Sequence, residues 1–318
     1  MSLHVVVGAG PVGSATARLL AARGEQVRLI TRTGRGPQPR LGHPAAGDGG
    51  VGGIECVAAD ATDAEALARH ADSAAALYSC AGPAYDRWAT DWPPLGAALM
   101  RAAEGSGAVL VTTGNLYGYG QPDGVMTEET PLRPNSVKGR VRAELWTTAL
   151  EAHEAGRIRT AEVRGSDYLG AHALSPFSVM VLPKVIAGRR GAIPADLDSP
   201  HSWTYVGDVA RTLVAVADDE SAWGRAWHVP TSEPASIRAL ADRAVELAGA
   251  PTARVVKMPT LALRLAGLSN PAARAMIETQ YQWQRPFVLD FTAATDAFGI
   301  EPTAIDKALR ETINGLHT

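Results

Sequence analysis

The stretch Leu3-His4-Val5-Val6-Val7-Gly8-Ala9-Gly10-Pro11-Val12-Gly13 decides the fold of this chain. Its first residues are mostly β-branched and apolar, as in a strand buried inside a parallel sheet. The glycines that follow have the spacing Gly-x-Gly-x-x-Gly, and residues 12–23 continue in a helical pattern. In such a strand–turn–helix unit, one glycine permits the tight turn, one lets the backbone approach a pyrophosphate, and one lets helix and strand pack closely. The free N–H groups at the helix start attract phosphate. The sequence therefore predicts a nucleotide site at Gly8, Gly10, Pro11, Val12 and Gly13.

Strand-like and helical segments alternate outward from this motif. The predicted strands are residues 3–7, 27–30, 54–57, 74–80, 108–112, 160–164 and 226–229. The predicted helices are residues 12–23, 63–72, 93–104, 137–155, the later part of 203–217, and 236–249. Residues 34–53 hold eight glycines and three prolines, which predicts a loop. The alternation predicts an α/β fold, a Rossmann-type doubly wound parallel sheet.

The regular alternation of predicted strands and helices ends after Gly170. Residues 171–201 carry turn signals around one apolar stretch, and the tail mixes helices with short extended pieces. We therefore expect a nucleotide-binding Rossmann domain made of residues 1–170 and 202–232. We expect residues 171–201 and 233–318 to form a small, discontinuous substrate-binding domain.

The composition narrows the class of partner. The 318 residues include 30 basic and 33 acidic side chains, a net charge of -3, which argues against a nucleic-acid partner. No apolar stretch reaches the ~18 residues of a membrane span, and the start Met1-Ser2-Leu3-His4 lacks the basic region of a signal peptide. Cys56 and Cys80 make neither a disulfide framework nor a metal cluster, and no other spacing suggests a metal. We expect a cytoplasmic protein that acts on a small molecule.

The end of the second predicted strand indicates which nucleotide is bound. NAD sites place an acidic residue there to bind the ribose 2′-hydroxyl, whereas this chain has Thr31-Arg32-Thr33 followed by Arg35. A carboxylate would repel a 2′-phosphate, and a guanidinium binds it in bidentate fashion. The prediction is NADP(H), in preference to NAD(H). The alternative is that Arg32 is only a solvated loop residue.

Six further segments, taken in order, resemble the short-chain dehydrogenase/reductase superfamily. The resemblance is to its extended and atypical branch, which includes the NAD-dependent epimerase/dehydratase proteins. The segments are Ala59-Asp60-Ala61-Thr62-Asp63, Tyr78-Ser79-Cys80-Ala81-Gly82, Val111-Thr112-Thr113-Gly114-Asn115-Leu116-Tyr117-Gly118, Thr127-Glu128-Glu129-Thr130-Pro131-Leu132-Arg133-Pro134, Val163-Arg164-Gly165-Ser166-Asp167-Tyr168-Leu169-Gly170 and Trp203-Thr204-Tyr205-Val206-Gly207-Asp208-Val209-Ala210.

The resemblance assigns roles to residues in these segments. It puts Thr113 at the catalytic Ser/Thr position, and by analogy it makes the helix at 137–155 the interface of a homodimer. The residues that it implies at the cofactor are Asp60, Ala61, Cys80, Ala81, Gly82, Thr112, Lys138, Gly165 and Ser166.

The chain departs from the family at the proton-transfer pair Tyr-x-x-x-Lys. None of its four lysines, at positions 138, 184, 257 and 307, has a tyrosine four residues earlier. Counted without gaps from Pro131, Lys138 replaces the tyrosine and Arg142 the lysine. Counted back from Glu144, Ser136 and Arg140 replace them. We prefer the first register, because it keeps a following glycine and needs no gap.

Lys138 then has three possible roles. A neutral amine beside Arg142 would act as an acid or base, because burial and a neighbouring cation lower the pKa of a lysine. An ammonium would polarise a substrate carbonyl. The third possibility is that Lys138, Arg140 and Arg142 have no chemical role and form the solvated basic face of a helix.

A displaced phenol is another source of the missing proton. Five tyrosines fall in segments expected to rim the cleft, although most buried tyrosines are packing residues with one hydrogen bond. They are Tyr85, Tyr117, Tyr119, Tyr168 and Tyr205, of which Tyr117 is the catalytic candidate. The predicted substrate contacts are Tyr85, Asn115, Tyr168, His172 and Trp203. His172 and His201 flank the inserted segment, and Trp203 with Trp283 suggests an apolar or aromatic ligand.

These observations favour an NADP(H)-dependent oxidoreductase of the atypical extended type, acting on a carbonyl, an alcohol or a related substrate. One alternative is a sensor or scaffold that keeps the nucleotide site without turnover. The other is an isomerase, epimerase or dehydratase that holds its cofactor tightly and catalyses no net redox change.

Overall fold

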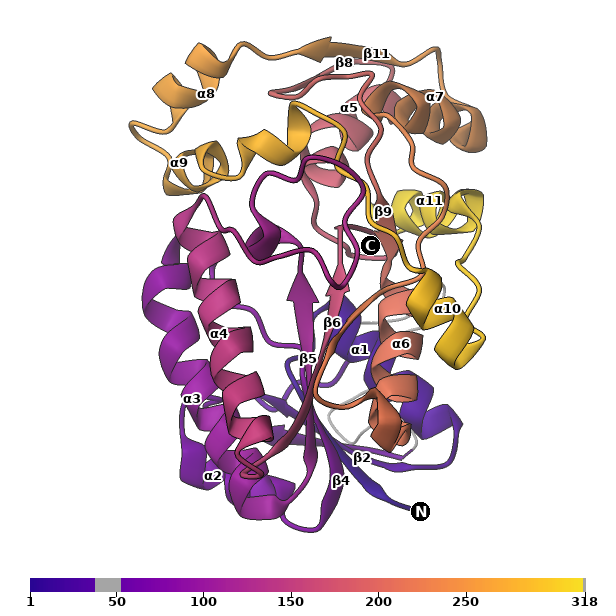
Figure 1. Cartoon of the computed structure of the whole chain (residues 1–318). Coiled ribbons are helices and arrows are strands. Elements are labelled where there is room, and N and C mark those ends of the chain that lie inside the picture. Colours follow the sequence, from indigo (N-terminus) through magenta and orange to yellow (C-terminus); the bar gives the residue numbers. More distant parts are fainter. Residues whose placement is uncertain (38–52, 317–318) are drawn as a thin grey trace.

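The computed structural model describes residues 1–37 and 53–316. Its centre is a seven-stranded parallel sheet in the order β10-β6-β5-β4-β1-β2-β3 (Figure 1). The strands are β1 (Leu3–Val7), β2 (Gln26–Thr31), β3 (Ile54–Ala58), β4 (Ala74–Ser79), β5 (Val109–Asn115), β6 (Arg159–Gly165) and β10 (Ala226–His228). The order reverses between β1 and β4, and a ligand crevice opens at such a point beyond the carboxyl ends of the strands. The predicted Rossmann fold is confirmed.

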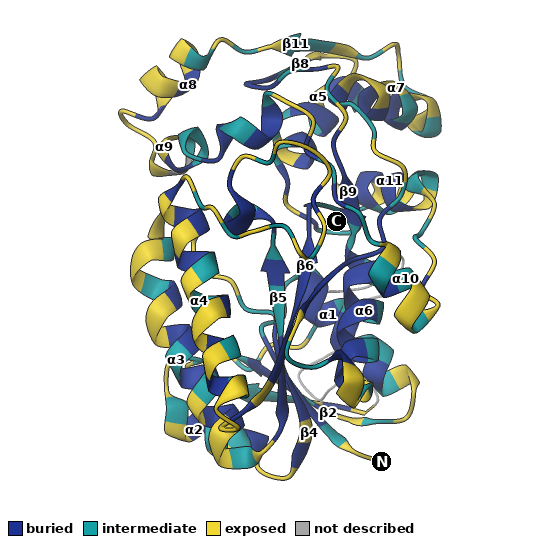
Figure 2. Cartoon of the chain, in the orientation of Figure 1, coloured by how far each residue is buried: buried dark blue, intermediate teal, exposed yellow. Residues whose placement is uncertain are grey.

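Helices cover both faces of the sheet. One face carries α2 (Ala64–Ala71), α3 (Trp88–Ser106) and α4 (Val137–Glu154), and the other carries α1 (Pro11–Ala22) and α6 (Val206–Asp218). Successive strand residues point to opposite faces, so Val5 and Val7 pack on the α2–α4 side and Val6 on the α1–α6 side. Figure 2 shows the resulting pattern, with buried strands inside and the exposed faces of the helices outside.

The predicted start of the helix at residue 93 is wrong. A 3-10 turn, η1 (Tyr85–Arg87), leads directly into α3 at Trp88, so Pro93 and Pro94 lie inside the helix. Arg87 donates two hydrogen bonds of 2.9 Å to Asp91 across this first turn. Burial of Trp92 against the sheet adds apolar contact that compensates for the N–H groups that the prolines lack. Most of the predicted loop at 34–53 lies outside the described residues.

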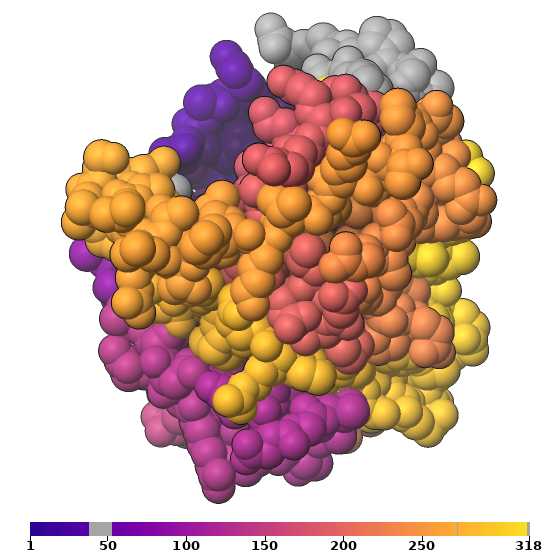
Figure 3. Space-filling view, turned by 90° about the horizontal axis from the view of Figure 1, so that it is seen from above, coloured from indigo at the N-terminus to yellow at the C-terminus, as the bar shows by residue number. Residues whose placement is uncertain are grey.

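A second layer sits over the carboxyl ends of the strands, and we call its residues 177–193 and 237–283 the cap (Figure 1). Its elements are η3 (Phe177–Val181), α5 (Leu182–Ile186), β8 (Arg190–Ile193), α7 (Ile237–Ala248), β11 (Arg254–Lys257), α8 (Thr260–Ala266), α9 (Pro271–Ile277) and η5 (Gln280–Trp283). Strands β8 and β11 pair in parallel. Figure 3 looks down on this layer, where segments beyond about residue 170 cover most of the visible face.

The remaining elements join the two layers. Strand β7 (Asp167–Leu169) follows β6 after one residue and pairs in parallel with β9 (Trp203–Tyr205) as a separate two-stranded sheet. Helix α11 (Ile305–Asn314) packs against α7, while α10 (Thr292–Phe298) returns to the central sheet, where the Phe298 and Trp227 rings lie 4.7 Å apart. The short turns η2 (Tyr117–Tyr119) and η4 (Glu220–Ala222) complete the chain. The division into two domains stays a prediction. Within the described ranges, no helix is long and apolar enough to cross a membrane.

Candidate functional site

A cavity of about 400 Å³ opens where the central sheet meets the cap. It lies at the carboxyl ends of β1, β4, β5 and β6, where the fold predicts a ligand. The lining residues predicted from the sequence are Gly10, Pro11, Val12, Cys80, Ala81, Gly82, Tyr85, Thr113, Asn115, Tyr117, Arg142, Gly165, Ser166 and Tyr168. The others that line it are Trp88, Trp92, Gly114, Leu116, Asp167, Leu174, Gln282 and Phe287.

The glycine turn forms one end of this cavity. Gly8 has a φ of +102°, and a Cβ added there would lie 2.6 Å from the backbone nitrogen of Ala81. A Cβ on Gly13 would overlap the carbonyl oxygen of Gly8. Gly10 precedes α1 without a capping side chain, and a Cβ added there would meet no atom of the described residues within 4 Å. The turn is thus closed on the protein side and open on the cavity side, which fits the pyrophosphate of a dinucleotide.

The end of β2 carries the residues expected at the ribose. Arg32 and Arg35 are exposed, and Thr31 donates a 3.3 Å hydrogen bond to the carbonyl of Arg35. Asp60, after β3, accepts hydrogen bonds from the backbone and hydroxyl of Thr62, which lower the pKa of its carboxyl; the charge of Arg32 lowers it further. None of the predicted contacts in this corner, which also include Thr33 and Ala61, lines the cavity itself.

Thr113 faces the cavity from β5, and its hydroxyl lies 3.6 Å from the sulfur of Cys80. Burial raises the pKa of Cys80 to about 11, so the group stays a neutral thiol near neutral pH. Thr112 does not line this cavity, because neighbouring residues of a strand point to opposite faces; it borders a smaller pocket under α3. Ser166 lines the cavity, and its buried hydroxyl has no hydrogen-bond partner among the described residues.

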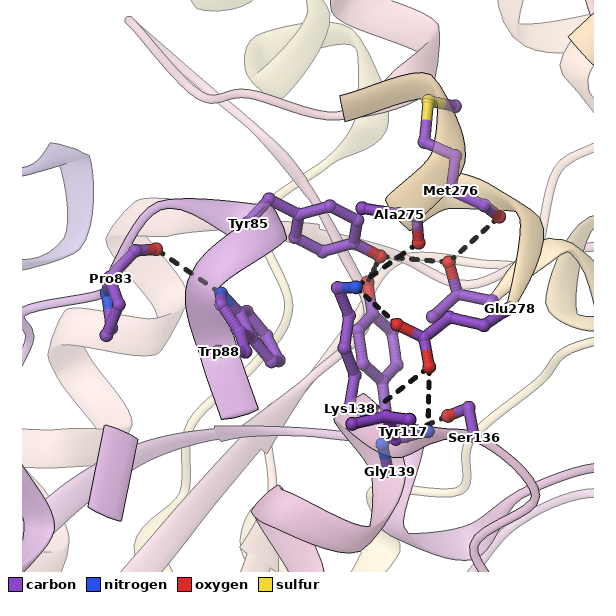
Figure 4. Close-up of polar contacts among 12 residues, drawn as sticks. Pro83, Tyr85, Trp88, Tyr117, Ser136, Lys138, Gly139, Ala275, Met276 and Glu278 are labelled. Atoms are coloured by element: carbon purple, nitrogen blue, oxygen red, sulfur yellow. Dashed lines mark hydrogen bonds and ion pairs between the residues drawn. The ribbon is translucent and has the colours of Figure 1, made fainter. Parts of the chain in front are cut away.

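Lys138 does not line the cavity, and the prediction of a proton-transfer role for it loses its geometric support. Its buried ammonium forms an ion pair with Glu278 and donates a 3.3 Å hydrogen bond to the carbonyl of Ala275 (Figure 4). The same nitrogen lies 4.4 Å from the centre of the Tyr85 ring. Glu278 also accepts from the backbone of Val137 at 2.7 Å. Lys138 therefore ties the start of α4 to the cap, and its partner stands 140 positions away in sequence.

Arg142 reaches the cavity from the next turn of α4. Its Nη2 donates to the carbonyl of Thr113 at 2.8 Å and to Glu162 at 3.1 Å, and its guanidinium lies 4.6 Å from the centre of a Trp92 ring. Burial lowers the pKa of Arg142, partly opposed by the Glu162 charge. Its Nε has no hydrogen-bond partner among the described residues. This orphaned donor beside the cavity also fits a ligand with oxygen atoms.

The alternative register for the missing pair finds no support in the geometry. Ser136 is the N-cap of α4, where its hydroxyl accepts a 3.0 Å hydrogen bond from the backbone of Gly139. Arg140 is exposed on the outer face of the helix. Neither residue lines the cavity.

Three tyrosines line the cavity, and each of their hydroxyl groups already has a hydrogen-bond partner in the protein. The hydroxyl of Tyr85 lies 3.3 Å from that of Tyr117 and 2.9 Å from that of Thr279. Burial raises the pKa of Tyr85 to about 12 and raises that of Tyr117 as well. Tyr168 donates a 3.5 Å hydrogen bond to the carbonyl of Gly114, and burial raises its pKa too.

Two further tyrosines considered as rim residues face elsewhere. Tyr119 is bonded to His228 at 2.7 Å, and Tyr205 donates to Glu311 at 2.6 Å. Neither lines the cavity.

Two predicted substrate contacts lie outside the cavity. Trp203 is buried in the core of the cap, and its indole donates a 2.8 Å hydrogen bond to the carbonyl of Ala235. His172, with a φ of +59°, lines a different groove between α1 and α6. Both were placed by position in the sequence, which does not say on which side of the intervening strand pair a side chain lies.

Asp167 is an acidic cavity residue that was not predicted from the sequence. It begins β7, two positions after the end of β6 at Gly165, and its carboxylate Oδ2 lies 2.9 Å from Nε2 of His201. A carboxylate just beyond the carboxyl end of a parallel strand was the available signal. The cavity residues Trp88, Trp92, Gln282 and Phe287 were not predicted either, because nothing in the local sequence marks a residue of α3, of the cap or of the segment after it as a cavity wall. No cluster of three or more potential metal ligands occurs in the described part of the chain.

Comparison with known proteins matches this architecture. The sequence model of the NAD dependent epimerase/dehydratase family matches residues 4–229. No curated protein matches the chain in sequence.

Solved structures match the fold over the whole chain. The enzyme WbmH from Bordetella bronchiseptica, in complex with NAD+, has a TM-score of 0.73 at 18% identity, covering 100% of this chain and 99% of that one. UDP-glucose 4-epimerase from Thermotoga maritima, with UDP-glucose, has a TM-score of 0.77 at 16% identity with coverage of 100% and 99%. A double mutant of DesIV, a dTDP-glucose 4,6-dehydratase from Streptomyces venezuelae, has a TM-score of 0.72 at 19% identity with coverage of 98% and 96%. At these identities the likeness extends to the fold alone.

Proposed function

This chain belongs to the NAD dependent epimerase/dehydratase family, and from that premise we propose that it is an NADP(H)-dependent oxidoreductase. Its substrate is a small carbonyl, alcohol or related compound held in the aromatic part of the cavity. One observation carries the proposal: a single cavity of about 400 Å³ joins the open glycine turn to Thr113 and to a wall of aromatic side chains. Cofactor and substrate sites of hydride-transfer enzymes adjoin in this way.

In this proposal, separate residues bind the cofactor and the substrate. Gly10 and the start of α1 bind the pyrophosphate, and Arg32 with Arg35 binds a 2′-phosphate. Thr113 donates a hydrogen bond to the substrate oxygen. Arg142 holds the carbonyl of Thr113 in place and offers its free Nε to ligand oxygen atoms. When bound, the nicotinamide supplies or accepts the hydride.

The aromatic wall suits an apolar or aromatic substrate. Trp88 lies 5.3 Å from Tyr85 and 5.8 Å from Tyr117, measured between ring centres. Together with Trp92 and Phe287, these rings exclude water from the reacting carbon, which strengthens the hydrogen bonds that polarise the substrate.

The test has two stages. Full-length protein is titrated with NADPH and with NADH, and binding is followed by the fluorescence of the reduced nicotinamide. The protein with bound cofactor is then mixed with a panel of aliphatic and aromatic aldehydes, ketones and alcohols, and the near-ultraviolet absorbance of the cofactor is followed. Tighter binding of NADPH and turnover of an aromatic compound are expected. Tight binding with no turnover of any compound would favour a sensor or scaffold instead.

An epimerase or dehydratase without net redox change is the second candidate. The family match supports it, and structures of the same fold include a UDP-glucose 4-epimerase and a dTDP-glucose 4,6-dehydratase. It predicts a cofactor that co-purifies and does not exchange. Conversion of UDP-glucose, followed by NMR of the sugar while cofactor absorbance stays constant, would favour this reaction over the first.

The homodimer also stays a proposal. It places the exposed face of α4 against a second copy of the chain. Sedimentation of the full-length protein tests it: a monomer at micromolar concentration contradicts the proposal.

A further inference from the structure

A carboxylate and an imidazole form a buried pair at the wall of the cavity. Asp167 lines the cavity, and its side chain is 12% exposed. Its Oδ2 lies 2.9 Å from Nε2 of His201, whose side chain is 4% exposed. The other carboxylate oxygen, Oδ1, has no hydrogen-bond partner within the described ranges. One oxygen of Asp167 is therefore held by the protein, and the other is free for a ligand.

The imidazole is fixed in place by aromatic rings and by its backbone. The His201 ring stacks on Trp283, with centres 4.3 Å apart and planes within 10°, and also on Phe287 at 5.5 Å. Trp203 contacts a further side of the ring at 4.9 Å. The backbone of His201 exchanges two hydrogen bonds with Ala235. A group held this firmly is preorganised for proton transfer at a defined atom.

Other groups near the cavity are poorly suited to exchange a proton near neutral pH. Burial raises the pKa of Tyr85 to about 12 and raises those of Tyr117 and Tyr168. Arg142 is a guanidinium already bonded to Glu162 and to a backbone carbonyl. The Lys138 ammonium pairs with Glu278 outside the cavity wall. Asp167 and His201 instead combine a carboxylate and an imidazole, two side chains that commonly serve in general acid–base catalysis, at the wall of the cavity.

We propose that Asp167, backed by His201, is the proton-transfer residue of this site, in place of the tyrosine that the chain lacks. The proposal rests on the hydride-transfer function proposed above. In the oxidation direction, the substrate O–H bond breaks and its proton passes to Asp167; an oxidised nicotinamide, when bound, would supply the acceptor for the hydride of the adjoining carbon. His201 then takes the proton from Asp167 and releases it to solvent. Reduction runs these steps in reverse, with the proton delivered to the carbonyl oxygen.

The charges around the pair are few. Asp167 faces the phenols of Tyr85, Tyr117 and Tyr168, which are neutral below their raised pKa values. The charged group that shares the cavity wall is Arg142. His201 faces the uncharged rings of Trp203, Trp283 and Phe287.

The experiment uses 4-nitrophenol, which tests without turnover whether Asp167 receives a ligand O–H group. Full-length protein is titrated with the probe at the pH where half of the free probe is phenolate, which absorbs at longer wavelength. A carboxylate accepts a hydrogen bond from the neutral phenol and repels the phenolate, so the wild-type protein should bind the neutral form and lower the phenolate absorbance. D167N should lose this preference for the neutral phenol, and H201Q, which replaces the ring that holds the carboxylate, should weaken it.

The control is D208N. Asp208 is a buried carboxylate on α6 that accepts hydrogen bonds from Arg211 of the same helix and from Thr303, and it does not line the cavity. A purely structural role for buried aspartates would make D208N and D167N behave alike, whereas the proposal requires the preference for the neutral phenol to survive in D208N. A wild-type protein that binds both forms of the probe equally, or a D167N protein with the wild-type preference, would overturn the proposal.

A turnover experiment separates this proposal from the proposed function. With any substrate found in the carbonyl panel, D167N should lower kcat about 100-fold, as general acid–base groups do, and should remove one limb of the pH profile. Its affinity for NADPH should stay within twofold of wild type. Failure of the whole panel contradicts the oxidoreductase function, and the phenol probe still decides the role of Asp167.

Discussion

The two halves of the cavity are built in different ways. The cofactor half consists of the backbone and small residues of short contiguous segments, Gly10–Val12 and Cys80–Gly82. The substrate half consists of large side chains from segments far apart in the chain, such as Trp88, Asp167 and Phe287. Backbone geometry depends on local residue type, whereas a wall of side chains depends on how distant segments pack. The first half therefore follows from a motif, and the second does not.

The largest expected effects lie in the cofactor half. G13A places a Cβ on the carbonyl oxygen of Gly8 and should abolish NADPH binding while also lowering the melting temperature. G10A should abolish or severely weaken binding with little change in melting temperature, because the space around that position is open in the protein and is needed by the ligand. Fluorescence titration and thermal unfolding measure the two quantities. Equal loss of stability in both variants would break the distinction between the protein side and the ligand side of the turn.

The next largest effect lies where the two halves meet. T113V removes the hydroxyl that faces the cavity and should lower kcat by about 10- to 100-fold, since it removes a hydrogen bond to the reacting oxygen. T112V is the matched control, because Thr112 points to the opposite face of β5. Steady-state kinetics with a substrate from the panel give the comparison. A larger loss in T112V than in T113V would contradict the orientation of β5.

A smaller effect lies at the junction with the cap. K138M leaves Glu278 without its cation and should lower the free energy of unfolding by about 1–3 kcal/mol, the cost of an unsatisfied partly buried group. Urea unfolding of K138M, E278Q and the double variant measures the coupling between the two residues. The double variant should be less destabilised than the sum of the single ones. A K138M protein with full stability and a shifted pH profile would restore the catalytic role predicted from the sequence.

The smallest effect is expected at the outer edge of the cofactor half. R32A should weaken NADPH binding about tenfold, the order of one exposed charge-assisted contact to phosphate, and leave NADH binding unchanged. Parallel titrations with the two nucleotides give the ratio of affinities. If R32A changes the affinities for NADPH and NADH equally, or changes neither, Arg32 is only a solvated loop residue.

The outcome at α4 shows how far sequence reasoning reached. The gap-free register placed Lys138 and Arg142 at the positions of the missing pair, and Arg142 does line the cavity. The direction of the Lys138 side chain could not be predicted from the register, because Glu278 lies beside it only through the packing of the cap on α4. Trp203 and His172 were misplaced for a related reason, since an adjacent strand or turn decides which cavity a side chain faces.

The sequence by itself determined the glycine turn, the parallel sheet and the family, since these depend on local backbone requirements and on the period of apolar residues. It also exposed the absence of Tyr-x-x-x-Lys, which is a matter of spacing. Only the tertiary structure decided what stands in that place. Asp167 and His201 are 34 positions apart, and they meet because β7 and β9 pair beside the cavity while Trp283 of the cap stacks on the imidazole that contacts the carboxylate. Long-range pairing of this kind follows from the packing of the whole chain and leaves no local mark in either segment.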